Sequence, residues 1–168
     1  TNNVSNAFYD FEDFSDIVER GTINIVQKKL SDSFGSKENF EKLMAEWLDI
    51  ASQNKSEIVV IDSISSMRTL LRNDRVYTRA AAEMAYTFRS AGLTSIFTME
   101  VKKYVDRSNN ETGLFNTSMF DGIISLSLDE IEGSSQYNLY VPKLRNSNHR
   151  ISSFPYQITS KGFDLLTS

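Results

Sequence analysis

The sequence predicts an α/β fold, a mostly parallel sheet flanked by helices with antiparallel strands added at one edge. Three observations support this. Helix and strand patterns alternate through roughly the first 100 residues. Two short apolar runs within them, "IVVI" at 58–61 and "TSIF" at 94–97, are typical of parallel strands that helices cover on both faces. From residue 121 onward the chain shows strand patterns only, separated by turn residues.

Composition limits the function. The chain of 168 residues suits a single domain, and 40% hydrophobic residues suffice for a core. The absence of cysteine and the single histidine exclude disulfides, thiolate metal sites and His-rich zinc sites. A net charge of −4 argues against nucleic-acid binding over the whole surface. No apolar run has the length of a membrane span and no signal-peptide pattern opens the chain, so a soluble, cytoplasmic protein is expected.

The first third of the chain predicts three elements. Residues 8–21 predict a short helix that ends at Gly21, and "TINIVQKKL" at 22–30 alternates like a strand. The next stretch predicts a strongly amphipathic helix. Its apolar positions are Phe40, Leu43, Met44, Trp47, Leu48 and Ala51.

The middle of the chain predicts a strand at 58–61, a loop or short helix at 63–74, and a helix at 75–91 with Asp74 as N-cap. We expect the buried stripe of that helix to be Val76, Ala80, Met84 and Phe88. Gly92 ends it, and a second buried strand runs to Glu100. A polar loop at 102–117 follows, then a hairpin at 121–145 turning at "EGSS" and a shorter hairpin at 156–166.

Two carboxylates follow the apolar strands. Ligands of open α/β sheets bind at the carboxyl ends of the strands, where Asp62 and Glu100 lie. A rigidly held carboxylate suits Mg²⁺, so Asp62 is a candidate metal residue, although such an aspartate can also simply cap the next helix. Glu100 can orient a water or sense phosphate, or it can be a buried partner of Lys102 or Arg79.

A second group of candidates follows the long hairpin. Lys143 and Arg145 are two residues apart at a strand end, so both project to one side and suit a phosphate. The alternative is a charged strand end that discourages edge pairing. His149, in a polar loop, can bond a phosphate or a neighbouring subunit, or it can be merely solvated.

The loop at 102–117 interleaves basic side chains with Tyr104, a pattern that can bind single-stranded nucleic acid. Asp106 and Glu111 dilute its charge, which favours a solvated loop. Nucleic acid, bound through residues 102–117, is therefore the less favoured alternative for a partner.

These pieces together resemble the KaiC-like branch of the RecA-superfamily ATPases. "IVVIDSISSM" resembles the Walker B strand of that family, "GLTSIFTME" its G-x-T-x-L-x-T-x-E strand, and "FDGIISL" its ADGVI-x-L strand. "YNLYVPKLRNSNHRISSFPYQITSKGFDLL" resembles its L-x-V-x-K-x-R-G-x-x-H segment and the strands that follow. Order and spacing agree over roughly residues 57–166.

The resemblance implies a RecA-like core that binds ATP and Mg²⁺ between subunits of a ring-shaped homo-oligomer, in signalling or regulation. By this analogy Asp62 serves the metal, and Ser63 lies beside it at the nucleotide. Lys143, Arg145 and His149 would contact nucleotide, with Arg145 stabilising charge on the transferring phosphate of the adjacent subunit. Glu100 would be the second catalytic residue.

The sequence also departs from the family pattern. No P-loop, G-x-x-x-x-G-K-[ST], occurs in the 168 residues, and Asn2 and Asn3 stand where the family has paired glutamates. We therefore expect a single domain, 1–168, incomplete at its N-terminus and not competent for hydrolysis alone. The alternative is a non-catalytic pseudo-ATPase that acts as an oligomerisation or interaction module, and a weaker one is recombinase-like DNA binding.

Overall fold

The computed structural model describes residues 14–27, 36–71, 73–101, 119–131 and 133–166. The chain forms two compact units. The helical unit comprises residues 26–119, and the hairpin unit comprises residues 1–25 and 120–168. No helix in the described part of the chain is long and apolar enough to cross a membrane.

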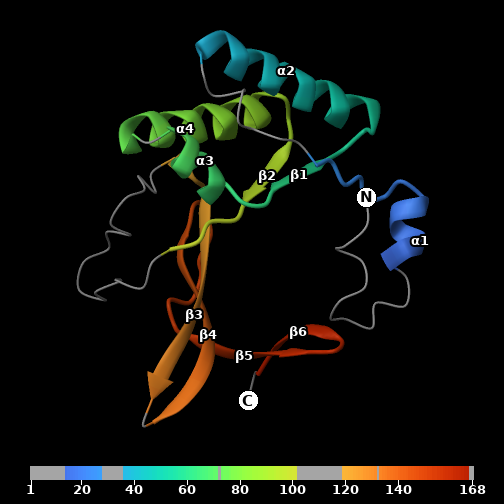
Figure 1. Ribbon diagram of the computed structural model, residues 1–168. Coiled ribbons are helices and arrows are strands. Elements are labelled where there is room, and N and C mark those ends of the chain that lie inside the picture. Colours follow the sequence, from blue (N-terminus) through green and yellow to red (C-terminus); the bar gives the residue numbers. More distant parts are fainter. Residues whose placement is uncertain (1–13, 28–35, 72, 102–118, 132, 167–168) are drawn as a thin grey trace. The chain divides into compact units, whose positions relative to one another are not determined.

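The helical unit contains a parallel pair of strands. Strand β1 (Ile58–Ile61) pairs in register with β2 (Thr94–Phe97), from Ile58 opposite Thr94 to Ile61 opposite Phe97. Helices α2 (Lys37–Gln53), α3 (Ser65–Leu71) and α4 (Asp74–Ser90) complete the unit. Helices α2 and α4 lie on the same side of the strand pair (Figure 1). Both predicted strands of this unit are present, but β2 ends at Phe97 and not at Glu100 as predicted.

Helix α2 confirms the amphipathic pattern read from the sequence. Ser36 caps it, because its hydroxyl accepts a hydrogen bond of 3.1 Å from the Asn39 N–H. Leu43, Met44 and Ala51 are buried on its inner face. Trp47, on the same helix, stacks on Phe88 of α4 with ring centroids 6.3 Å apart. The predicted apolar face therefore joins α2 to α4.

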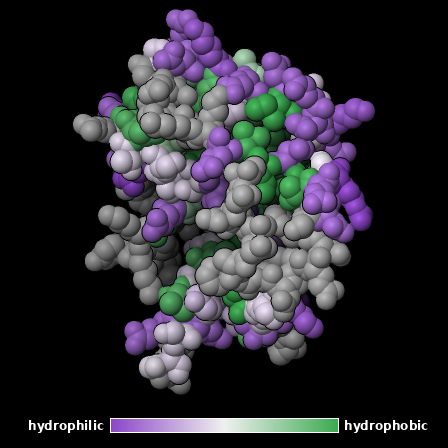
Figure 2. All heavy atoms as spheres, turned by 45° about the vertical axis from the view of Figure 1, so that its right-hand side comes forward, coloured by the Kyte–Doolittle hydropathy of each residue, from purple (hydrophilic) through white to green (hydrophobic). Residues whose placement is uncertain are grey.

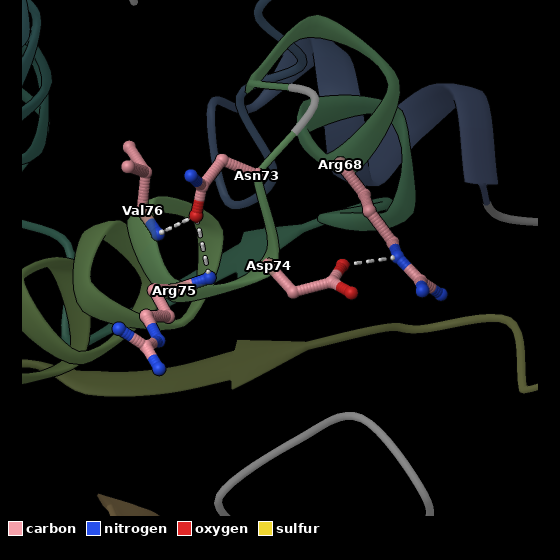
Figure 3. Close-up of polar contacts among 5 residues, drawn as sticks. All are labelled: Arg68, Asn73, Asp74, Arg75 and Val76. Carbon is pink, nitrogen blue, oxygen red and sulfur yellow. Dashed lines mark hydrogen bonds and ion pairs between the residues drawn. The ribbon is translucent and has the colours of Figure 1, made fainter.

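The N-cap of α4 is Asn73, which corrects the prediction of Asp74. The Asn73 side-chain oxygen accepts from the Arg75 and Val76 N–H groups at 3.0 and 3.2 Å (Figure 3). Asp74 instead occupies the first turn of the helix, where its carboxylate accepts a 3.0 Å hydrogen bond from Arg68 of α3. An amide can cap a helix as well as a carboxylate can, so Asn73 and Asp74 are both suitable N-cap residues. In the structure Asn73 is the cap, and Asp74 forms the ion pair with Arg68.

The buried stripe of α4 is also shifted from the predicted one. Its members are Tyr77, Ala81, Met84, Ala85 and Phe88. Val76, predicted inside, is 48% exposed. At the start of the helix the buried face is shifted by one residue, so that Tyr77 and not Val76 faces the core. The larger aromatic ring buries more apolar surface there. Gly92 follows the helix with φ of 77°, as predicted for a stop.

The two faces of the β1–β2 pair differ, which corrects the expectation of strands covered on both sides. Val59, Ile61 and Phe97 are half-buried, and Phe97 lies against Phe88 with ring centroids 6.3 Å apart. Ile58 and Val60, on the opposite face, are both 57% exposed. Apolar side chains of this face therefore remain at the surface. Figure 2 shows, for one side of the molecule, that hydrophobic residues are exposed among hydrophilic ones.

In the hairpin unit, α1 (Phe14–Glu19) confirms a short helix within the predicted 8–21, and residues 8–13 lie outside the described residues. The helix is followed by Gly21 with φ of 71°. The strand predicted at 22–30 is wrong over 22–27, which are irregular. Ile23 and Ile25 are 41% and 53% exposed. An alternating apolar and polar sequence forms a stable strand only when another strand pairs with it. No strand among the described residues pairs with this segment.

Four antiparallel strands form the sheet of the hairpin unit, in the order β3–β4–β5–β6. They are β3 (Gly122–Ile131), β4 (Ser134–Leu144), β5 (Phe154–Thr159) and β6 (Gly162–Leu165). Both predicted hairpins are thus confirmed (Figure 1). Tyr156 of β5 is buried and lies between Tyr137 and Phe163, with ring centroids at 5.3 and 4.4 Å.

The register of the long hairpin shifts near its base. Ser125 pairs with Tyr140, but Ile123 pairs with Lys143, so β4 has one extra residue there. Such a bulge accommodates Pro142, which has no N–H to donate to a neighbouring strand. A bulge also redirects the residues that follow it. The positions of Lys143 and Arg145 therefore depend on this local irregularity.

Candidate functional site

The carboxyl ends of β1 and β2 are joined by hydrogen bonds around Asp62. The Thr98 hydroxyl donates to Asp62 Oδ1 over 2.5 Å. The Thr98 backbone N–H donates to the Ile61 carbonyl, and the Ile64 N–H donates to the Thr98 carbonyl, each over 3.1 Å. The peptide bond between Asp62 and Ser63 is cis. As predicted, Asp62 lies at the carboxyl end of an apolar strand, and its side chain is exposed.

Glu100 is tied to the same edge through its backbone. The Glu100 N–H donates a hydrogen bond of 2.8 Å to the hydroxyl of Ser65, which is the first residue of α3. The Ser66 hydroxyl in turn donates to the Ser63 carbonyl over 2.9 Å. The Glu100 side chain is exposed and not buried, and Lys102, one of the two partners considered for it, lies outside the described residues. The structure therefore brings Asp62, Ser63 and Glu100 to one edge.

The donor set at this edge consists of oxygen atoms. The Asp62 carboxylate and the hydroxyls of Ser63, Ser65 and Thr98 suit a hard cation such as Mg²⁺. Within the described ranges, no group of three or more His, Cys, Asp or Glu residues is placed to hold a metal ion. One carboxylate fits a magnesium ion whose remaining ligands are water and phosphate oxygens. These residues therefore fit a metal that arrives with a nucleotide.

Lys143 and Arg145 lie at the base of the long hairpin, in the other unit. Lys143 pairs with Ile123, and the Arg145 backbone N–H donates to the Asp121 carbonyl over 2.8 Å. The Arg145 guanidinium also reaches the Asp121 carboxylate, with Nη1 3.5 Å from Oδ1. The Arg145 side chain is 47% exposed, so this is a surface ion pair of small energy. Arg145 thus has a resting partner that the sequence did not indicate.

His149 is half-buried after the turn that follows β4. Its Nδ1 lies 3.4 Å from the Ser147 carbonyl oxygen. Its Nε2 atom is buried and has no hydrogen-bond partner among the described residues. Its role at a phosphate therefore stays a prediction.

Sequence reasoning missed Thr98 and Ser65, the hydroxyl groups that organise the edge. A detectable signal was present. Thr98 directly follows β2, as Asp62 directly follows its in-register partner β1, so the two residues are opposite one another. The predicted loop at 102–117 and the positions Asn2 and Asn3 lie outside the described residues.

Comparison with known proteins gives a consistent result. A family model described as the KaiC ATPase matches residues 3–168. A UPF0273 protein of Pyrococcus horikoshii is 34% identical over 108 residues, which are 62% of this chain and 40% of the relative. A UPF0273 protein of Thermotoga maritima is 29% identical over 119 residues, 69% of this chain and 46% of the relative. Each alignment therefore spans less than half of the relative's length.

The fold has a solved counterpart. The crystal structure of a KaiC-like protein from the hyperthermophilic archaeon Pyrococcus horikoshii superimposes with a TM-score of 0.72 and 20% sequence identity. The match covers 92% of this chain and 65% of that one. At this identity the similarity shows the fold, a RecA-type α/β architecture with parallel and antiparallel strands.

Proposed function

Because the chain belongs to the KaiC family of ATPases, we propose that it is an ATP-binding module in which Asp62 serves a nucleotide-bound Mg²⁺. The observation that supports this most is the Asp62 carboxylate at the end of β1, held by the Thr98 hydroxyl. In open α/β sheets this is the edge at which ligands bind. A bound Mg²⁺ would neutralise phosphate charge, and Asp62 as the Walker B carboxylate would hold it or its water shell.

The neighbouring residues have distinct roles in this proposal. Ser63 lies beside Asp62 and offers its hydroxyl to the nucleotide. Glu100 orients a water for attack or senses the terminal phosphate, since its exposed carboxylate is on a backbone that Ser65 fixes. The edge is exposed in the isolated chain, so exclusion of water from the reaction depends on what covers it.

Lys143, Arg145 and His149 act on the nucleotide of an adjacent subunit in a homo-oligomeric, ring-shaped assembly. Arg145 stabilises charge on the transferring phosphate, and Lys143 adds a second cation from the same strand end. This arrangement requires Arg145 to exchange its weak surface pair with Asp121 for phosphate, which is a stronger, bidentate partner. The role proposed for such an assembly is regulatory or in signalling.

Nucleotide binding in the presence and absence of metal tests the role of Asp62. We would titrate a fluorescent ATP analogue into the full-length natural protein, in the presence of either Mg²⁺ or EDTA. Wild-type protein should bind more tightly with Mg²⁺, and Asp62→Asn should lose most of that enhancement while its affinity in EDTA stays the same. Asp49→Asn, an exposed carboxylate of α2, is the matched control. Equal enhancement in the Asp62 variant would contradict the proposal.

A second candidate is a non-catalytic interaction module. One observation favours it: an apolar row on β3, Ile124, Leu126 and Leu128, is 69%, 56% and 44% exposed. An exposed apolar row of this kind is typical of an interaction surface. This reading predicts that assembly, measured by analytical ultracentrifugation, is independent of Mg-ATP. A change of oligomeric state on adding Mg-ATP would exclude it.

A further inference from the structure

We propose that Thr98 is a positioning residue for Asp62, fixing the plane of its carboxylate toward a hydrated Mg²⁺. The inference rests on the proposed function of Asp62 and adds a residue to which no role has been assigned. It is carried by the 2.5 Å hydrogen bond from the Thr98 hydroxyl to Asp62 Oδ1, which links residues 36 positions apart.

The register of the strands brings the two side chains together. Ile61 and Phe97 are the last paired residues of β1 and β2, so Asp62 and Thr98 are the next residues on each strand. Successive side chains alternate between faces, so these two project to the same side of the pair. The contact therefore follows from strand pairing, which holds both backbones in place.

Thr98 itself is fixed more firmly than its exposure suggests. Its N–H donates to the Ile61 carbonyl and its carbonyl accepts from Ile64, both over 3.1 Å. A threonine side chain is also restricted about its first torsion, because its β-carbon is branched. A hydroxyl on such a residue is a pre-organised donor, whereas a serine would have more rotamers.

The hydrogen bond leaves the carboxylate suited to a metal. The Thr98 hydroxyl has one proton, which it donates in a hydrogen bond to Asp62 Oδ1. Oδ2 and the remaining lone pair of Oδ1 can then face a cation or its bound water. Partners that hold a metal-binding carboxylate in this way raise metal affinity by restricting its rotation. Without the Thr98 hydroxyl, the Asp62 carboxylate loses this restraint.

The test compares three variants of the full-length natural protein: Thr98→Val, Thr98→Ser and Thr94→Val. Thr94 begins the same strand and is exposed, so its variant makes the same chemical change away from Asp62. The readout is the Mg²⁺ concentration that gives half of the metal-dependent gain in binding of the fluorescent ATP analogue. Circular dichroism confirms that each variant is folded.

Thr98→Val should raise the half-saturating Mg²⁺ concentration about threefold to tenfold, at or below the low end of the roughly tenfold to hundredfold loss typical of such partners, because the site is exposed. Thr98→Ser should recover most of the loss, and Thr94→Val should match wild type. Binding in EDTA should be the same for all, which a general loss of structure would not give.

Two other outcomes overturn the inference in different ways. If Asp62→Asn removes the metal effect but Thr98→Val matches wild type, the positioning role is wrong and the proposed function stands. If Asp62→Asn also matches wild type, the proposed function fails and the role of Thr98 fails with it.

Discussion

The Phe88 ring should be the largest single contributor to the stability of the helical unit. It is completely buried and lies 6.3 Å from both the Trp47 ring on α2 and the Phe97 ring on β2. Removing it opens a cavity between a helix and the strand pair, so Phe88→Ala should cost about 3–5 kcal/mol of unfolding free energy. Domains of this kind are stabilised by only about 5–15 kcal/mol, so the loss is a large fraction.

Urea denaturation measures this loss. With a slope of about 2 kcal/mol per molar urea, the midpoint should fall by about 2 M. The single tryptophan, Trp47, gives a fluorescence signal from the packing partner itself, and circular dichroism checks it independently. Should the alanine variant not fold, Phe88→Leu should still lower the free energy by about 1 kcal/mol. Tyr86→Ala, 67% exposed on the same helix, is the control. Equal midpoint shifts for Tyr86→Ala and Phe88→Ala would refute the argument.

Two further predictions concern α4. Asn73→Ala removes the oxygen that caps the helix and should lower the unfolding free energy by about 1 kcal/mol in the same urea assay, whereas Asn73→Asp should restore most of it. Burial is the main cause that raises the pKa of Tyr77, with the Arg68 charge opposing it and the Asp74 charge adding to it. The folded chain therefore keeps a proton that the unfolded chain loses, so stability falls as pH rises above about 10, the ordinary tyrosine value. Tyr77→Phe should make the melting temperature less dependent on pH between about 9 and 11, and an unchanged slope would contradict this reading.

The elements that could be predicted from the sequence are those whose patterns are local. Helix α2 has an apolar residue at every position that a buried face requires, and the turn at "EGSS" joins two alternating strands. The strand predicted at 22–30 had an equally regular pattern, but a strand also needs a partner. Partners are long-range, and a single sequence does not show them.

The choice between near-equivalent residues was also beyond the sequence. Asn73 and Asp74 are both good caps, and the ion pair between Asp74 and Arg68, on a different helix, is formed with Asn73 in the capping position. Similarly, Asp62 was recognisable from its place after an apolar run. The hydroxyl of Thr98 became part of the site only once β1 and β2 were known to be parallel, adjacent and in register.

The two groups of candidate residues are held in different ways, and this bears on how each can act. Asp62 is fixed by hydrogen bonds between neighbouring strand ends, which suits a residue that must present a carboxylate in one orientation. Arg145 is placed by a hairpin whose register shifts beside Pro142, and its guanidinium forms a 3.5 Å surface ion pair with Asp121. An exposed ion pair of this kind contributes little to stability, so exchanging it for a phosphate costs little. The pre-organised residue is therefore the one proposed for the chain's own nucleotide, and the adaptable one is proposed for a neighbour's.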